Sequence, residues 1–463
     1  MKNMTMYLVG LAALGAIGPE VAAASKVGAR PNVLIILVDD AGYNDFGFMG
    51  TTDLLTPNID ALAHQGVVFD DAHVAATVSS PSRACLITGR YGHRFGYECN
   101  LSNRSDGLPP EEQTLGDVFK RGGYRTAAVG KWHLGSLPEM HPNCRGFDLF
   151  YGMLAGSRSY FYNAKGSDRP GAEQNLQRNG RQECFEGYLT DRFTDEAVRF
   201  IEEADQPFLL YLAYNAVHSP MQALPADLEC FAGHRRQKLA AMTWALDRGV
   251  GRVMESLRRT GQLENTLIFF LSDNGGATTN QSNNYPLKGF KGNKFEGGHR
   301  VPFFVAWPGH IEGGRHYAGL SSSLDIFATA IDAAGVEPPR LPLDGVSLLP
   351  YLYGKKKGMP HQRLFWRKLD SRAVRDGYWK LVMTQGVDTV LYRLDTDLDE
   401  MRDLSGEHPE KCRELIRHLH DWENHCMKAR WDEGKWGAIT NHLHLLLMSN
   451  KIKTAKDLKG RKR

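Results

Sequence analysis

Continuous apolar runs that end in polar side chains constrain the fold of this chain more than any other feature. Residues 33–38 are all apolar, and Asp39 follows them directly. Residues 266–271 repeat the pattern shortly before Asp273. Similar runs cover residues 125–129, 208–213 and 301–307. Such runs are typical of strands that are buried on both faces, as in parallel sheets.

Helical patterns lie between these runs. They cover residues 59–63, 114–119, 191–203 and 238–260. Strands that alternate with helices predict an α/β fold with a large, mostly parallel sheet flanked by helices. In such sheets ligands bind beyond the carboxyl ends of the strands. Because groups of polar residues follow four of the predicted strands, we expect the functional site at this edge of the sheet.

The length of the chain predicts a second, smaller unit. The chain has 463 residues, more than one ordinary domain of about 100–200 residues contains. After a change in composition at 351–358, short alternating runs predict a small antiparallel sheet, and a helical pattern follows at 409–425. The short runs cover residues 372–375, 379–383 and 390–394.

These patterns predict the domain boundaries. We expect a catalytic α/β domain over 28–355, an α+β subdomain over 356–440 and a frayed basic tail over 441–463. Over the whole chain, 56 basic and 53 acidic residues nearly balance. This balance excludes the strongly basic surface that a nucleic-acid-binding protein presents, so we expect no nucleic-acid partner.

The first 24 residues are typical of a secretory signal peptide. Lys2 precedes an apolar segment at 6–17, and Ala22-Ala23-Ala24 offers a cleavage site. We therefore expect an exported protein, located in a bacterial periplasm. We expect no membrane span, because no other apolar run approaches the roughly 20 residues that a membrane helix needs.

Seven cysteines leave at least one thiol free, because the number is odd. Export permits disulfides. Cys412 and Cys426 are candidates for a disulfide, but the spacing fits buried helix residues equally well.

Oxygen ligands follow two of the predicted strands. Asp39 and Asp40 come after the first strand, and Asp273 and Asn274 come after the strand at 266–271. Each pair alone is more often a helix cap or a turn. Two such pairs at the ends of strands in one sheet favour a site for a hard cation, Ca²⁺ or Mg²⁺, over a zinc site.

Residues 79–90 have the form Ser-x-Pro-Ser-Arg-x-x-Leu-x-Thr-Gly-Arg. By itself this stretch is typical of a turn that enters a helix. Together with four further blocks it resembles the type I sulfatases, and the blocks stand in the order of that family. They cover residues 31–40, 130–135 and 216–220, followed by 272–275 with 289–292 and 296–298. The resemblance extends from Pro31 to about Arg430 and implies an alkaline-phosphatase-like fold.

The resemblance also implies roles for individual residues. Ser79 would be oxidised to formylglycine by a formylglycine-generating maturase that accepts serine. The metal ligands would be Asp39, Asp40, Ser79, Asp273 and Asn274. Arg83, one helical turn after Ser79, would hold the hydrated aldehyde, or else form a salt bridge.

Four further residues would act on the sulfate and the leaving alcohol. Lys131 would stabilise charge on the sulfate, and His133, two residues later, would be the base of the elimination step. His218 would donate a proton to the leaving alcohol. Lys291 would contact the leaving side of the sulfate. A lone histidine or lysine is more often structural or solvated.

We therefore expect a sulfuric ester hydrolase, with a sulfated saccharide as the preferred substrate. Aromatic and Arg side chains at 156–162 could stack on a sugar ring or form a packed loop. One alternative is a phosphate or phosphonate monoester hydrolase of the same superfamily. The other is a glycan-binding pseudoenzyme, in which Ser79 stays unmodified.

Overall fold

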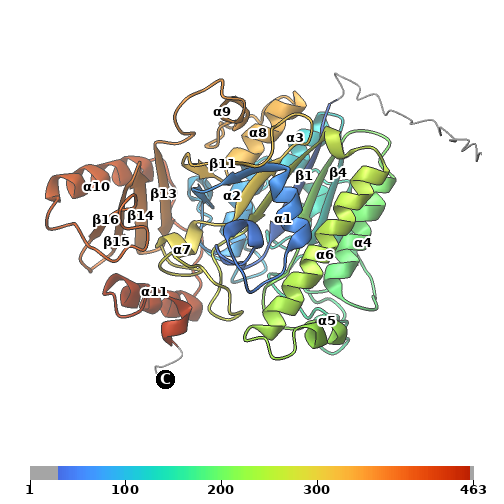
Figure 1. Cartoon of the computed structure of the whole chain (residues 1–463), viewed down its shortest axis with the longest axis horizontal. Coiled ribbons are helices and arrows are strands. Elements are labelled where there is room, and N and C mark those ends of the chain that lie inside the picture. Colours follow the sequence, from blue (N-terminus) through green and yellow to red (C-terminus); the bar gives the residue numbers. More distant parts are fainter. Residues whose placement is uncertain (1–29, 459–463) are drawn as a thin grey trace, which may run out of the picture.

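The computed structural model describes residues 30–458. The predicted signal peptide lies outside the described residues. The chain forms a large α/β unit with a smaller C-terminal unit beside it (Figure 1). The α/β fold that the sequence predicts is confirmed.

The large unit contains a sheet of ten strands. Their order across the sheet is β11-β2-β10-β9-β1-β8-β4-β5-β6-β7. Five neighbours, from β9 to β5, are mutually parallel, whereas β10 is antiparallel to β9. The strands are β1 (Asn32–Val38), β2 (Gly66–Phe69), β4 (Arg125–Lys131), β5 (Leu149–Met153), β6 (Gln177–Arg178), β7 (Arg181–Gln182), β8 (Phe208–Ala213), β9 (Thr266–Ser272), β10 (Phe303–Ala306) and β11 (Arg315–Tyr317).

Helices cover both faces of this sheet (Figure 1). Along β1, Val33 and Ile35 pack with helices α2, α3 and α8, while Leu34 and Ile36 pack with α1, α4 and α6. Burial of both faces explains why the strand is apolar at every position. The helices are α1 (Pro57–His64), α2 (Ser79–Thr88), α3 (Leu115–Arg121), α4 (Leu189–Glu202), α6 (Gln237–Arg259) and α8 (Asp325–Ala334).

Shorter elements complete the large unit. A two-stranded sheet pairs β3 with β12. The short elements are β3 (Ala72–His73), β12 (Ser321–Ser322), α5 (Pro225–Cys230), α7 (Glu296–His299) and α9 (Leu349–Leu352).

The C-terminal unit has a four-stranded antiparallel sheet and two helices. Strands β14, β15 and β16 occupy the alternating runs that the sequence analysis identified, and β13 is an additional strand before them. Its inward side chains alternate as Leu364, Trp366 and Lys368. The elements are β13 (Arg363–Lys368), β14 (Ser371–Asp376), β15 (Trp379–Thr384), β16 (Val390–Arg393), α10 (Pro409–Glu423) and α11 (Lys435–Met448).

Helix α11 differs from the frayed tail that was expected from residue 441. It crosses that boundary and buries Leu447 and Met448 in the core of the C-terminal unit, next to Phe295. The prediction was wrong here because the apolar segment Leu445–Met448 outweighs the basic residues that follow it.

Within residues 30–458, the helices are too short or too polar for any of them to cross a membrane. All seven cysteines lie in this part of the chain and are free thiols. Cys85 and Cys99 are buried, whereas Cys412 and Cys426, the pair considered for a disulfide, are half-buried and unbonded.

Candidate active site

The ends of two neighbouring parallel strands bring the oxygen ligands together. Val38 of β1 is in register with Ser272 of β9, so the residues that follow meet at one edge of the sheet. The backbone N–H of Asp40 donates to Asp273 Oδ1 (3.2 Å), and Asn274 Nδ2 donates to Asp40 Oδ1 (2.8 Å). Asp39 and these three residues are almost completely buried. The two pairs therefore form one polar cluster.

Ser79 faces this cluster from the first position of α2. Its Oγ lies 3.3 Å from Asp39 Oδ1 and 3.2 Å from Asn274 Oδ1. The first N–H groups of a helix have no partner in the helix and attract anions. The helix therefore presents Ser79 where an anionic substrate can approach the oxygen cluster.

Three buried or half-buried basic side chains, from Lys131, Lys291 and Arg83, balance the charges of the three aspartates in the cluster. Lys131 Nζ lies 2.7 Å from Asp39 Oδ2, and Lys291 Nζ lies 2.6 Å from Asp40 Oδ1. Arg83 Nη2 lies 2.8 Å from Asp273 Oδ2, and its Nη1 donates to the Lys131 carbonyl. In this structure Arg83 thus contacts a carboxylate and the backbone, which is a buried form of the expected salt bridge.

These ion pairs set the charges of the site. Burial alone would raise the pKa of Asp39, but Lys131, with His218 and Arg83, holds that pKa below its ordinary value. Burial would likewise raise the pKa of Asp40, and Lys291 is the main group that lowers it. Burial would lower the pKa of Lys291, but Asp40 keeps it above its ordinary value. Both carboxylates and Lys291 are therefore charged at neutral pH.

His133 and His218 lie on the wall of the same cavity. Burial, together with the nearby charge of Lys131, holds the pKa of His133 well below its ordinary value. Its Nδ1 has no hydrogen-bond partner among the described residues, so a neutral His133 can accept a proton. His218 is partly exposed, and its Nε2 lies 3.5 Å from Asp40 Oδ2.

Backbone strain marks two of these positions. Asp40 (φ 61°) and His133 (φ 58°) both adopt the left-handed conformation, which non-glycine residues rarely adopt. Gly156 lies against the His133 ring, where an added Cβ would approach Nε2 to 2.5 Å. Glycine at this position therefore leaves room for the imidazole.

The oxygen cluster fits a hard divalent cation. Asp40 Oδ2 is buried and has no hydrogen-bond partner among the described residues. Lys131 contacts Asp39 Oδ2 and Lys291 contacts Asp40 Oδ1, so the second oxygens that a cation would use are Asp39 Oδ1, next to Ser79 Oγ, and Asp40 Oδ2. A buried oxygen without a donor is costly unless an ion binds it. His218 also comes within reach of the cluster, which the sequence analysis did not foresee.

A cavity of about 680 Å³ opens onto these residues. Ser79, Lys131, His133, His218 and Lys291 line its floor and sides. Its volume is in the range of small-molecule sites, about 300–1,000 Å³. Further walls come from Asn100–Ser102, Ala277–Thr279 and residues 433–443.

The aromatic loop at 156–162 is mainly a packed loop. Tyr160 is fully buried and stacks on Tyr188, with ring centroids 5.4 Å apart. Its hydroxyl donates to the carbonyl oxygens of Asn215 and His218. Tyr160 therefore supports the segment that carries His218 and is not accessible to a sugar.

Asn280 is a supporting residue that the sequence analysis missed. It is buried, and its Nδ2 donates to the carbonyl oxygens of Asp40 and Val217, both at 3.0 Å. Asn280 thus joins the segment that carries the oxygen ligands to the segment that carries His218. A single asparagine in a loop gives no sequence signal for such a role.

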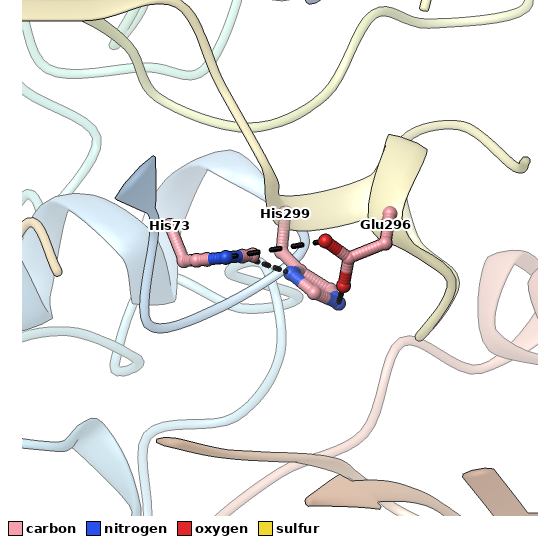
Figure 2. A group of neighbouring side chains, drawn as sticks. All are labelled: His73, Glu296 and His299. Carbon is pink, nitrogen blue, oxygen red and sulfur yellow. Dashed lines mark hydrogen bonds and ion pairs between the residues drawn. The ribbon is translucent and has the colours of Figure 1, made fainter. Parts of the chain in front are cut away.

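Figure 2 shows a second group of potential metal ligands, His73, Glu296 and His299. None of the three lines the cavity. Lys380 Nζ lies 2.9 Å from Glu296 Oε1, and Arg375 Nη1 lies 3.3 Å from Glu296 Oε2. These two cations come from the C-terminal sheet and already pair with both carboxylate oxygens. The group is therefore a buried ionic contact between the two units.

Removal of the Glu296 carboxylate should destabilise the protein strongly. Glu296→Ala leaves the buried cations Lys380 and Arg375 with one partner fewer, which costs about 3–5 kcal/mol in the free energy of unfolding. Chemical denaturation measures the loss. The exposed pair Arg402–Glu407 provides the control, since Glu407→Ala should cost less than about 1 kcal/mol. A loss below 1 kcal/mol in Glu296→Ala would contradict the assigned contact.

Comparison with known proteins places the chain in a family. It matches the family model described as Sulfatase over residues 31–336. It also matches the model described as N-sulphoglucosamine sulphohydrolase, C-terminal, over residues 291–428. The chain belongs to the sulfatase family, and it is a sulfuric ester hydrolase. The resemblance seen in the five sequence blocks is confirmed.

Individual relatives agree with this assignment. The chain is 35% identical over 395 residues to "Uncharacterized sulfatase YdeN" of Escherichia coli (strain K12), a match that covers 73% of this chain and 68% of the relative. It is 33% identical over 404 residues to N-acetylgalactosamine-6-sulfatase of Mus musculus, covering 81% of this chain and 74% of the relative.

Solved structures share the fold. Ps i-CgsB superposes with a TM-score of 0.83 at 35% identity, covering 91% of this chain and 99% of its own, and it has also been solved in complex with k-i-k-neocarrahexaose. The phosphonate monoester hydrolase of Agrobacterium radiobacter, at 22% identity and a TM-score of 0.65, shares the fold alone.

Proposed function

We propose that this sulfatase removes sulfate from a saccharide through a formylglycine derived from Ser79, with a bound divalent cation. The observation that carries the proposal is the position of Ser79 Oγ, within 3.3 Å of both Asp39 and Asn274 and at the start of a helix. Ca²⁺ fits the oxygen donors, and Mg²⁺ is the second candidate. The cation would neutralise charge on the sulfate and favour an ionised hydroxyl at position 79.

The chemical reason for a modified Ser79 is the release of product. An ordinary serine that attacks sulfur is left as a stable sulfate ester. Oxidation to the aldehyde removes two hydrogens, and addition of water gives two hydroxyls on one carbon. One hydroxyl attacks sulfur, and the S–O bond to the sugar breaks. The other then loses its proton to neutral His133, the C–O bond to the sulfate breaks, and the aldehyde forms again.

The charged residues have complementary tasks in this reaction. Lys131 and Lys291 approach the cluster from different elements, β4 and the loop after β9, so a sulfate between them meets a cation on each side. Arg83 holds Asp273 in place. His218, whose partly exposed side chain lines the cavity, would protonate the leaving oxygen of the sugar.

His218→Ala should impair saccharide sulfates far more than aryl sulfates. A sugar alkoxide is a poor leaving group and needs a proton, whereas a phenolate leaves with little help. General acid catalysis is worth about 10²–10⁴-fold, so kcat/KM for the saccharide should fall by that factor and kcat/KM for the aryl ester much less. The assay compares both esters in wild type and variant. Equal losses would assign the acid to Lys291 and leave His218 as a sulfate ligand.

A saccharide substrate is supported by two observations. The cavity is larger than a sulfate needs, and Ps i-CgsB, 35% identical, has been solved with the oligosaccharide k-i-k-neocarrahexaose. A panel of sulfated saccharides and phosphate monoesters, assayed for released sulfate and phosphate, tests the substrate class. Phosphate release that exceeds sulfate release would favour the phosphatase alternative.

The state of Ser79 separates the enzyme from a pseudoenzyme. Mass spectrometry should find the peptide that contains Ser79 lighter by two hydrogens than the unmodified peptide, because a maturase that accepts serine has oxidised the side chain. An unmodified peptide together with saccharide binding but no sulfate release would favour a glycan-binding protein.

Because residues 1–24 are typical of a signal peptide, we also propose that the enzyme is exported to the periplasm.

A further inference from the structure

Helix α11 forms one wall of the active-site cavity. Four of its residues line the cavity: Trp436, Ile439, Thr440 and Leu443. Their spacing of three, four and seven residues places them on one helical face. The same face continues with His444 and Leu447, four residues after Thr440 and Leu443, and these two side chains are buried in the C-terminal unit. One face of the helix therefore lines the substrate cavity near the start of α11 and packs on the protein core near its end.

Trp436 is the most exposed large hydrophobic side chain of the described residues, at 72% of its maximum area. Ile439, one turn further, is 42% exposed. Large apolar side chains that line a cavity together and remain in contact with water indicate a binding surface. The cavity beneath them is polar, with Lys131, His133 and Lys291 in its wall. Its occupant must therefore combine an anionic group with an apolar face.

Contacts to the catalytic unit hold the start of α11 in place. Glu433 Oε1 accepts the backbone N–H of Asn100 (2.8 Å), and its Oε2 accepts Lys368 Nζ (2.5 Å). Asn100 Oδ1 in turn accepts the backbone N–H of Ser80, the neighbour of Ser79 (3.0 Å). Two hydrogen bonds thus connect Glu433, three residues before Trp436, with the helix that carries the nucleophile.

Helix α11 lies outside the residues that the two family models match. The two family models match residues 31–336 and 291–428, and α11 begins at Lys435. Ser79, the cations and the histidines all lie inside the first match. The proposed catalytic residues thus lie inside the first family-model match, and Trp436 lies outside both matches.

We propose that Trp436 is the platform on which a sugar ring of the substrate stacks, and that Trp436 helps to select the saccharide. This inference rests on the proposed saccharide sulfatase function. A pyranose ring has apolar C–H faces and a polar edge, so it can cover the indole while its sulfate reaches Ser79, Lys131 and Lys291. Ile439 extends the same apolar surface by one turn of the helix.

The test compares Trp436→Ala with Trp436→Phe on the best sulfated oligosaccharide of the panel. Trp436→Ala removes the aromatic ring on which the sugar stacks. We expect the KM of this variant to rise about tenfold and its kcat to stay nearly unchanged. The KM of Trp436→Phe should stay within about threefold of the wild-type value, because phenylalanine keeps an aromatic ring. Binding of the same saccharide to Trp436→Ala in a Ser79→Ala background, measured by calorimetry, should weaken by the same factor.

Two controls distinguish the loss of stacking from a general distortion of the active site. Inhibition by inorganic sulfate, which lacks a ring, should be unchanged in Trp436→Ala. Tyr378→Ala removes an aromatic side chain that is 55% exposed in the turn between β14 and β15, outside the cavity, and should leave KM unchanged.

The outcomes distinguish the two proposals. If wild type releases sulfate from the saccharide and Trp436→Ala keeps KM and saccharide affinity within twofold, the stacking platform is refuted and the proposed function stands. If wild type releases sulfate from no saccharide, the proposed function fails and the platform fails with it. Equal weakening of saccharide and inorganic sulfate would also refute the platform, because it would indicate a distorted site.

Discussion

Ser79→Ala is expected to abolish sulfate release, with a loss of at least about 10⁴-fold in kcat. The methyl side chain has no oxygen for attack on sulfur and cannot be oxidised to an aldehyde. The fold should be retained, because the hydrogen bonds of Ser79 Oγ within residues 30–458 are two long ones, 3.3 Å to Asp39 and 3.2 Å to Asn274. The saccharide should still bind, since Lys131, Lys291 and the cavity walls remain.

The measurement is sulfate release under saturating substrate, together with saccharide binding by calorimetry. Ser82→Ala is the matched control, because Ser82 is a buried serine of the same helix that does not line the cavity. Its activity should be compared per molecule of formylglycine, counted by peptide mass. Turnover within tenfold of wild type in Ser79→Ala would exclude the formylglycine mechanism.

Removal of the divalent cation is expected to have the second-largest effect. A chelator should lower kcat by about 10²–10³-fold, because electrostatic stabilisation of the sulfate is lost. It should also lower the melting temperature, since a ligand at 100 times its Kd contributes about 2.7 kcal/mol to stability. Addition of Ca²⁺ should restore both, and Mg²⁺ should do so less well if the site prefers Ca²⁺.

Asp40→Asn assigns the effect to the proposed site. The variant keeps the shape of the side chain but removes the charge that faces the cation, so Ca²⁺ should no longer raise the melting temperature. Glu414→Gln is the control, because Glu414 belongs to a separate group with Asp376 and His418 on the C-terminal unit. If Ca²⁺ still raised the melting temperature of Asp40→Asn but no longer raised that of Glu414→Gln, the cation would bind at that separate group.

The sequence by itself predicted the central strands of the large sheet and the candidate site residues at their ends. Strands β1, β8 and β9 can be predicted from the sequence, because burial on both faces requires apolar side chains at every position. The ends of these strands then identify Asp39, Asp40, Asp273 and Asn274, since parallel strands end at one edge. Strand β13 was not predicted, because its sequence places Leu364, Phe365 and Trp366 in a row and its alternation appears only in the burial of the side chains.

Only the tertiary structure decided which partners these residues have. The contacts of Arg83 with Asp273, and of Lys380 with Glu296, join positions 190 and 84 residues apart. No local periodicity encodes such a pair, because each side chain alone is equally compatible with a solvated surface. The position of α11 has the same origin. Its charged surroundings suggested a frayed tail, but burial of Leu447 and Met448 in the C-terminal core fixes the helix, and Trp436 near its start lines the active-site cavity. Packing of this kind becomes visible only when both partners are in place.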